Sequence, residues 1–182
     1  MILTAMGDSL VYGYGVGCEN SFINMDMEGI EVVNQGINGD TSAGVLHRIE
    51  NAPDADIILV FVGVNDFLIG MSVDTVTSNI MKILEKIFHR GKKAILCIPF
   101  LLSEEEDFTN ILSIANNKIT KYREKILELK DESLLLIDFY RELKKQPDYS
   151  SLFFDGIHPT QKTHDLMKSI LIKSMEEKGW IL

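Results

Sequence analysis

The sequence predicts an α/β domain in which helices cover both faces of a five-stranded parallel sheet. Five short runs, mostly rich in Val, Ile and Leu, are continuously apolar rather than alternating, which is typical of strands buried on both faces. The runs are residues 2–6, 31–35, 57–62, 93–98 and 134–139. Segments with helical spacing lie between them, and this alternation indicates parallel pairing. With 182 residues and no repeat or linker, the chain is expected to form a single domain over residues 1–182.

The clearest helix is expected between Ser72 and Gly91. Ser72 is a suitable N-cap, and the glycine ends the helix. Between them apolar residues recur three and four positions apart, as on the buried face of a helix. These residues are Val73, Val76, Ile80, Ile83, Leu84 and Ile87.

A longer helix is expected after Ser103, which forms a capping-box pattern with Glu106. The acidic residues 104–107 would then be its first turn, where negative charge complements the helix dipole. Its apolar positions are Phe108, Ile111, Leu112, Ala115, Ile119, Tyr122 and Ile126. A last helix, ended by a glycine, is marked by Leu166, Ile170, Leu171 and Gly179.

Composition excludes several classes of function. The net charge of −9 argues against nucleic-acid binding and against a polybasic membrane anchor, because both need a surplus of Lys and Arg. No stretch approaches the length of a membrane span, so no stable membrane insertion is expected. Cys18 and Cys97 are too few for a disulfide framework, and no motif marks either as catalytic. No signal peptide is visible, so the chain as given is expected to be cytoplasmic.

Ser9, Asp155 and His158 supply the three roles of a nucleophilic triad. A serine hydroxyl is a weak nucleophile at neutral pH and needs a base, which in turn needs an orienting acceptor. The aspartate and histidine are three positions apart, so a single turn can bring the carboxylate to the imidazole. Pro159 disfavours helical backbone at His158 and leaves it on the loop before the last helix. Alone, the Asp–His pair would suggest a surface helix cap; with the serine it favours a catalytic site.

The candidate residues all follow strands, and such positions meet at one edge of an open α/β sheet. Ser9 follows the first strand, Gly39 the second and Asn65 the third, while the Asp–His pair lies in the long loop after the fifth. Acyl transfer also needs donors for an oxyanion. The Asn65 amide and the backbone N–H groups of Gly39 and Ser9 are the candidates, the glycine because it has no Cβ. Taken singly, Gly39 and Asn65 would be explained about as well as turn residues.

Neighbouring signals have simpler interpretations. Residues 13–17 are rich in glycine but lack the register of a dinucleotide loop, and are expected to form a flexible loop beside the nucleophile. Asp8 and Asp66 are expected to be hydrogen-bonding braces for the loops. The histidines outside the predicted site, His47, His89 and His164, have no metal-ligand spacing.

The site residues lie in four blocks that resemble, in order, those of the SGNH hydrolases, also called the GDSL esterase/lipase family. The blocks are Gly-Asp-Ser-Leu at Ser9, Asn-Gly-Asp-Thr-Ser at Gly39, Gly-Val-Asn-Asp at Asn65, and Asp-x-x-His at Asp155 and His158. The first block alone is a weak signal, but four in order are highly specific and span nearly the whole chain. The resemblance is closest to small lysophospholipase/thioesterase-like and arylesterase-like members.

This resemblance implies a flavodoxin-like three-layer sandwich and a reaction that needs no metal. It implies that Ser9 is the nucleophile, His158 the base and Asp155 its partner. It also implies Ser9, Gly39 and Asn65 as the oxyanion donors.

Apolar residues near the predicted site indicate an acyl-binding wall. Phe67 and Leu68 follow the third strand, Phe100 and Leu101 follow the fourth, and Phe154 precedes the acidic member of the triad. Loops at an active edge are normally polar, so these clusters favour an apolar acyl group over a hydroxylated sugar. Ordinary packing under the loops would account for some of them.

The sequence therefore predicts a serine hydrolase that cleaves carboxylic esters, with thioesters or lysophospholipids as further candidates. It would act on a small-molecule acyl ester without a cofactor or a metal. Two alternatives stay open: a carbohydrate O-deacetylase of the same family, and a non-catalytic binding domain on the same fold. The complete set of five site residues argues against the second. No feature of the sequence indicates an oligomeric state.

Overall fold

The computed structural model describes residues 1–105 and 107–182 and contains a five-stranded parallel sheet. The strands are β1 (Ile2–Gly7), β2 (Glu31–Gly36), β3 (Ile57–Phe61), β4 (Lys93–Ile98) and β5 (Leu134–Asp138). Their order is β2-β1-β3-β4-β5, and every neighbouring pair is parallel. The direction of strand order reverses at β1, and in open α/β sheets sites form outside the carboxyl ends at such a point. The predicted fold class is confirmed.

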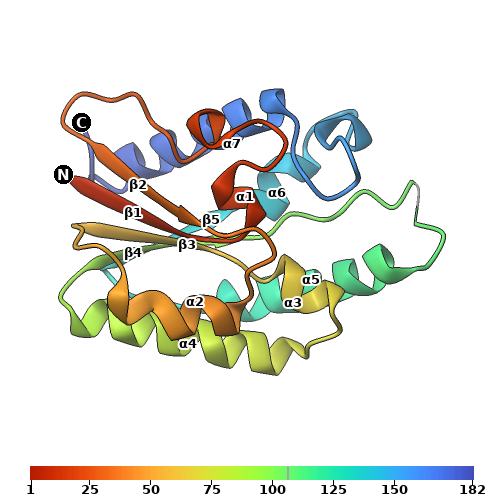
Figure 1. Ribbon diagram of the computed structural model, residues 1–182, viewed down its shortest axis with the longest axis horizontal. Helices are drawn as coiled ribbons and strands as arrows, with labels where there is room; N and C mark the ends of the chain where they lie inside the picture. The colour runs from red at the N-terminus through yellow and green to blue at the C-terminus, as the bar shows by residue number, and fades with distance from the viewer. Residues whose placement is uncertain (106) are drawn as a thin grey trace.

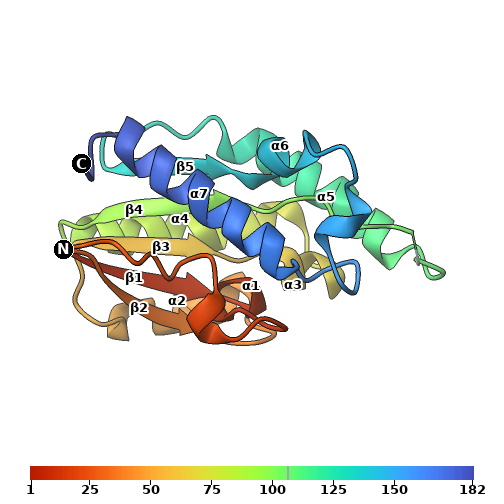
Figure 2. The same cartoon turned by 90° about the horizontal axis from the view of Figure 1, so that it is seen from above.

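Helices form a layer on each face of the sheet. They are α1 (Ser9–Tyr12), α2 (Ser42–Arg48), α3 (Val64–Leu68), α4 (Val73–His89), α5 (Ile111–Ile126), α6 (Phe139–Lys144) and α7 (Gln161–Glu177). Figure 1 shows α1, α6 and α7 on one face and α2, α3, α4 and α5 on the other. Both chain termini lie together at the end of the sheet opposite the strands' carboxyl ends (Figures 1 and 2). Within the described residues, none of these helices combines the length and apolarity needed to cross a membrane.

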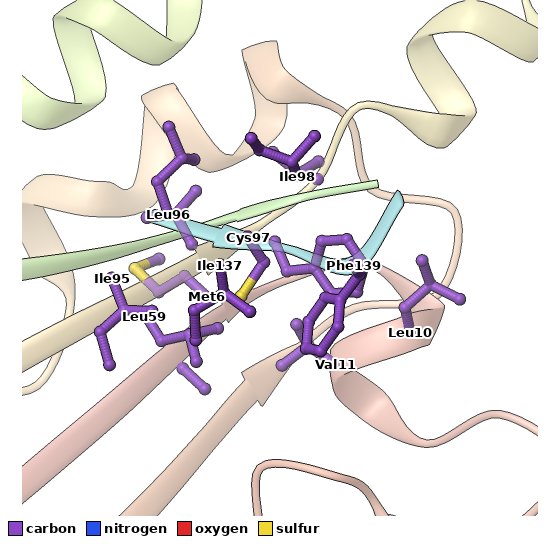
Figure 3. Close-up of a cluster of buried hydrophobic side chains, with 14 of the residues drawn as sticks. Met6, Leu10, Val11, Leu59, Ile95, Leu96, Cys97, Ile98, Ile137 and Phe139 are labelled. Carbon is purple, nitrogen blue, oxygen red and sulfur yellow. The ribbon is translucent and has the colours of Figure 1, made fainter. Parts of the chain in front are cut away.

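The core fills the space between the sheet and both helical layers. Every residue of β3 is buried, as its continuous apolar run predicts. Figure 3 shows the two faces on β4, where Leu96 and Ile98 point to one side of the sheet and Ile95 and Cys97 to the other. Burial raises the pKa of the Cys97 thiol, which therefore packs as a small apolar group. The strand β2 is only half-buried, because it lies at an edge and pairs with β1 alone.

Helices α4 and α5 differ in how well the sequence predicts them. Helix α4 begins as expected, with the Ser72 hydroxyl accepting the N–H of Thr75 at 3.1 Å. The predicted start of α5 is wrong: the helix begins at Ile111, eight positions after Ser103, and Phe108 is 93% exposed. Glu106, the other half of the predicted capping box, lies outside the described residues.

An aspartate upstream caps α5 instead. The carboxylate of Asp107 accepts the N–H of Ile111 at 3.1 Å and the N–H of Ser113 at 3.0 Å. Burial raises the pKa of Asp107, but the hydrogen bonds from the N–H of Ser113 and from Thr109 outweigh it, so the pKa lies below its usual value. Asp107 therefore caps the helix from outside it rather than as part of its first turn.

Candidate active site

Ser9 is held by the tight turn that joins β1 to α1. The carboxylate of Asp8 caps this short helix and accepts the N–H of Leu10 at 2.9 Å. Gly7 ends β1 where no side chain fits, since a Cβ there would come within 2.1 Å of the Phe61 carbonyl oxygen. Ser9 itself is 7% exposed. The turn thus presents one hydroxyl at the carboxyl end of the central part of the sheet.

The imidazole of His158 lies between the serine and Asp155. Its Nε2 is 3.0 Å from Ser9 Oγ, and its Nδ1 is 2.6 Å from Asp155 Oδ2. Asp155 Oδ1 accepts the N–H of Ile157 at 3.0 Å and the N–H of His158 at 2.7 Å. Burial raises the pKa of Asp155, but the N–H groups of His158 and Ile157 and the His158 ring outweigh it and hold the pKa below its usual value. Asp155 is therefore a carboxylate near neutral pH, and Nδ1 carries the proton that faces it.

Backbone contacts join the two ends of the loop that carries Asp155 and His158. Phe153 and Pro159 form an antiparallel bridge, and the N–H of Phe154 donates to the His158 carbonyl at 3.1 Å. As Pro159 predicts, His158 lies on the loop ahead of α7 rather than inside the helix. The backbone around the two residues is thus fixed independently of their mutual contact.

Gly39 lies in the turn after β2, and Asn65 is the second residue of α3, the short helix that follows β3. Both strands pair with β1, where Gly7 is opposite Gly36 of one and Phe61 of the other, so the three strands end side by side. Asn65 Nδ2 donates to the carbonyl of Asp40 at 2.9 Å. Since an amide nitrogen carries two hydrogens, the second remains for another acceptor.

The backbone conformation at position 39 favours a glycine. Its φ is +78°, in the left-handed region that side chains disfavour. Among the described residues, no heavy atom lies within 4 Å of the position that a Cβ would take. The positive φ is thus a second reason for a glycine at this position, and the close approach of its N–H to an oxyanion stays a prediction from the sequence.

A guanidinium joins the strand of the nucleophile to the loop of Gly39. Arg48 Nε and Nη2 lie 2.9 Å and 2.8 Å from Asp40 Oδ2, and Nη2 also donates to the Gly7 carbonyl at 3.0 Å. The Asp40 carbonyl in turn accepts from Asn65. One chain of contacts therefore runs from the end of β1 to the turn of Gly39 and on to Asn65 in α3. Rigid donors of this kind are what oxyanion stabilisation requires.

Asp66 is the second brace that the sequence predicts. Its buried carboxylate accepts the N–H and the hydroxyl of Ser42 at 2.8 Å and 2.6 Å. Asn79 donates to the same hydroxyl at 2.9 Å. Burial raises the pKa of Asp66, although the Ser42 hydrogen bonds lower it. These contacts connect α3, the helix that contains Asn65, to α2 and α4.

Asp8, the other predicted brace, is a buried carboxyl with one oxygen left without a hydrogen bond. The residue is 1% exposed, and among the described residues its Oδ2 has no partner. Burial raises the pKa of Asp8 to about 7; the Leu10 N–H lowers it, and the carboxylates of Asp40 and Asp66 raise it further. The native protein therefore holds this carboxyl protonated over a pH range in which the unfolded chain does not.

We expect Asp8→Asn to become more stable relative to wild type as pH rises. The quantity followed is the free energy of unfolding of the variant minus that of wild type. The folded pKa of about 7 lies above the ordinary value of 3.8, so the native state binds more protons between these values. Wild type must then lose stability as pH rises through this window. Asparagine can still accept the Leu10 N–H but has no charge to bury, so the difference should grow by roughly 3 kcal/mol from pH 5 to pH 8.

Denaturant unfolding at pH 5, 6, 7 and 8 measures this difference. Asp56→Asn is the control, because Asp56 is an exposed carboxylate that also accepts a backbone N–H, from Ile2 at 2.8 Å. A difference for Asp8→Asn that does not change with pH would contradict the burial argument.

The apolar residues predicted to line an acyl wall do not all reach the surface. Phe67 and Phe100 are 1% and 0% exposed and pack in the core, so the wall does not include them. Leu68 and Leu101 are half-buried, and Phe154 is 50% exposed.

Two aromatic rings flank the imidazole of His158. The ring centroid of Tyr14 lies 4.5 Å from that of the imidazole at an interplanar angle of 44°, and the centroid of Phe154 lies 5.7 Å away at 20°. The sequence analysis placed Phe154 at the site but missed Tyr14, which it treated as part of a flexible glycine-rich loop. An aromatic residue in such a loop, five positions after the nucleophile, is the signal that could have identified it.

Comparison with known proteins identifies related sequences and structures. The model of the GDSL-like lipase/acylhydrolase family matches residues 5–166. An arylesterase of Vibrio mimicus is 30% identical over 104 residues, which are 52% of this chain and 52% of that protein. An N-acylneuraminate cytidylyltransferase of Streptococcus agalactiae is 28% identical over 156 residues, or 83% of this chain and 36% of that protein. The chain thus spans about half or less of the length of these curated relatives.

A solved structure has the same fold over nearly the whole chain. A lipolytic G-D-S-L family protein from Desulfitobacterium hafniense superposes with a TM-score of 0.80, covering 95% of this chain and 98% of its own. The two sequences are 23% identical, so this likeness is one of fold.

Proposed function

Because the chain belongs to the GDSL-like lipase/acylhydrolase family, we propose that it hydrolyses carboxylic esters through an acyl intermediate on Ser9. The observation that carries this proposal is the unbroken line of contacts from Ser9 Oγ through the His158 ring to Asp155. A binding domain without catalysis has no need of such a line. The contacts therefore argue against the non-catalytic alternative.

In the acylation step, Ser9 Oγ attacks the ester carbonyl while its proton passes to His158 Nε2. The imidazolium that forms is stabilised by the Asp155 carboxylate 2.6 Å from Nδ1. His158 then gives the same proton to the oxygen of the leaving alcohol, and the bond between that oxygen and the acyl carbon breaks. The acyl group remains on Ser9.

The negative charge on the attacked carbonyl oxygen needs donors that are already in place. The candidates are the N–H groups of Ser9 and Gly39 and the free hydrogen of the Asn65 amide. The contacts of Arg48 with Asp40 and Gly7 support this assignment, since they hold the loop of Gly39 against β1. Asn65 is joined to the same loop through the Asp40 carbonyl.

Deacylation repeats the chemistry with water as the attacking group. His158 takes a proton from the water, whose oxygen forms the new bond to the acyl carbon. The bond to Ser9 Oγ breaks, and His158 returns the proton to the serine. The carboxylic acid leaves and the enzyme is restored.

Of the residues predicted to contact the acyl group, Leu68 and Leu101 remain candidates because they are half-buried, whereas Phe67 and Phe100 pack in the core. A short apolar acyl chain can be buried against the two leucines, at about 0.8 kcal/mol for each methylene. The cytoplasmic location and the absence of a metal and a cofactor stay predictions from the sequence.

Initial rates on p-nitrophenyl esters of increasing acyl length test the proposed function. We expect kcat/KM to rise from acetate over the first few methylenes and then to level off, and EDTA to leave the rates unchanged. Absence of hydrolysis of every ester would contradict the proposal. Activity lost with EDTA and restored by zinc would contradict the mechanism.

The alternative, deacetylation of a carbohydrate, keeps one supporting observation. The Streptococcus agalactiae relative, to which 83% of this chain aligns, is named for N-acylneuraminate, an acylated sugar. Acetylated sugars therefore belong in the same panel. A strict preference for them over p-nitrophenyl esters would favour the alternative.

A further inference from the structure

Two large aromatic side chains stand half-exposed around the imidazole of the candidate base. Tyr14 is 45% and Phe154 is 50% exposed. Their rings contact the ring of His158, with centroid distances of 4.5 Å and 5.7 Å, and contact each other at 6.2 Å and an interplanar angle of 24°. Ring surface that is left open beside a reacting group is available to a ligand.

Backbone hydrogen bonds fix the main chain of both aromatic residues before any ligand binds. The N–H of Tyr14 donates to the carbonyl of Ser9 at 3.0 Å, and the N–H of Phe154 donates to the carbonyl of His158 at 3.1 Å. The ring of Phe154 lies on Gly15, where a Cβ would come within 2.4 Å of two ring carbons and φ is +85°. The sequence suggests that Gly15 belongs to a flexible loop, but the ring of Phe154 packs directly against it.

The chemistry of ester cleavage identifies the part of the substrate that meets these rings. His158 Nε2 must protonate the leaving oxygen, so that oxygen has to come within hydrogen-bond distance of Nε2. The group attached to it then lies beside the imidazole, next to Tyr14 and Phe154. The carbonyl oxygen of the ester faces instead toward Gly39, in the turn after β2, and Asn65, in α3.

We propose that Tyr14 and Phe154 form a subsite for the leaving alcohol and that this subsite selects alcohols bearing an aromatic ring, an inference that rests on the proposed function. Aromatic rings pair in offset-stacked or edge-to-face geometries with centroids about 4.5–7 Å apart. Such pairs contribute about 0.5–1.5 kcal/mol beyond the burial of area, which corresponds to a two- to tenfold preference over a saturated ring of the same size.

The reverse reaction tests the subsite without the bias of a good leaving group. An alcohol can replace water in deacylation: its proton passes to His158 Nε2 and its oxygen bonds to the acyl carbon. The bond between that carbon and Ser9 Oγ then breaks, and His158 returns the proton to the serine. The attacking alcohol must occupy the place of the leaving alcohol, because the two steps are the reverse of each other.

The experiment uses p-nitrophenyl butyrate as acyl donor and an equal mixture of benzyl alcohol and cyclohexylmethanol as acceptors. Both acceptors are primary alcohols with a six-membered ring on the same carbon, and only one ring is aromatic. In wild type we expect two- to tenfold more benzyl butyrate than cyclohexylmethyl butyrate. Tyr14→Leu and Phe154→Leu should bring the ratio toward one. Tyr12→Leu, which changes an exposed tyrosine of α1, should leave it unchanged.

The outcomes separate this inference from the proposed function. No release of p-nitrophenol by wild type would contradict the hydrolase itself. Normal release with equal transfer to both alcohols, or with transfer to neither, would overturn the aromatic subsite and leave the hydrolase standing. Better transfer to methyl glucoside than to benzyl alcohol would also overturn it, in favour of a subsite for sugars.

Discussion

Replacing Ser9 with alanine is expected to lower kcat on p-nitrophenyl butyrate by about 10⁵- to 10⁶-fold, as loss of a triad nucleophile does in other serine hydrolases. The hydroxyl is the only group of the site placed to form the acyl bond, and its Oγ lies 3.0 Å from the base. Because Ser9 is small and begins a helix capped by its neighbour Asp8, alanine should fit without rearrangement.

Ser151→Ala is the matched control for this variant. Ser151 is an exposed serine near the loop of Asp155, and its hydroxyl donates to the Asp148 carbonyl at 2.9 Å. It should keep full activity. Near-normal turnover by Ser9→Ala, after purification that excludes contaminating esterase, would remove Ser9 from the mechanism.

The second largest effect is expected from Asp155→Asn, which should lower kcat about 10⁴-fold. The amide has no charge to stabilise the imidazolium, and its NH₂ group facing Nδ1 would favour the wrong tautomer of His158. One amide oxygen can still accept the N–H of His158, so the loop should keep its shape. Thermal unfolding of the variant checks that the fold is retained.

Asp148→Asn controls for the loss of a carboxylate in this region. Asp148 is exposed and accepts only the hydroxyl of Ser150, at 3.3 Å, through its side chain. Its replacement should not change kcat. Equal activity in Asp155→Asn and wild type would show that His158 needs no anionic partner.

The strands could be predicted from the sequence because each of the buried ones is a continuous apolar run. Their ends agree with the structure to within one residue: the run of residues 57–62 became β3 (Ile57–Phe61). The half-exposure of β2 could not be predicted, since only the order of the strands makes it an edge.

The short helices escaped the sequence analysis for a different reason. Helices α1 (Ser9–Tyr12) and α3 (Val64–Leu68) have four and five residues, too few to show a period. The start of α5 was misplaced because Phe108 fits the apolar spacing by chance. The true boundary depends on Asn110, whose φ is +59°, and on a cap formed by Asp107 from four residues upstream.

The residues of the proposed triad could be predicted because their chemistry and their motif agree. The apolar residues that line the site could not be predicted in the same way, because an apolar residue after a strand can point either into the core or toward the surface. Phe67 packs against Tyr122 with centroids 5.7 Å apart and is lost to the site, while Phe154 reaches it by resting on a glycine. Tyr14 could be identified only from the structure, in which the folded loop places its ring against that of His158.

The most direct test of the central claim is to find the residue that carries the covalent intermediate. Wild-type protein would be treated with a fluorophosphonate, which reacts with activated serines, then digested and mapped by mass spectrometry. The account predicts one phosphonate, on the peptide containing Ser9, and none on protein carrying His158→Ala. A phosphonate on another residue, or none on a preparation that hydrolyses esters at full rate, would contradict it.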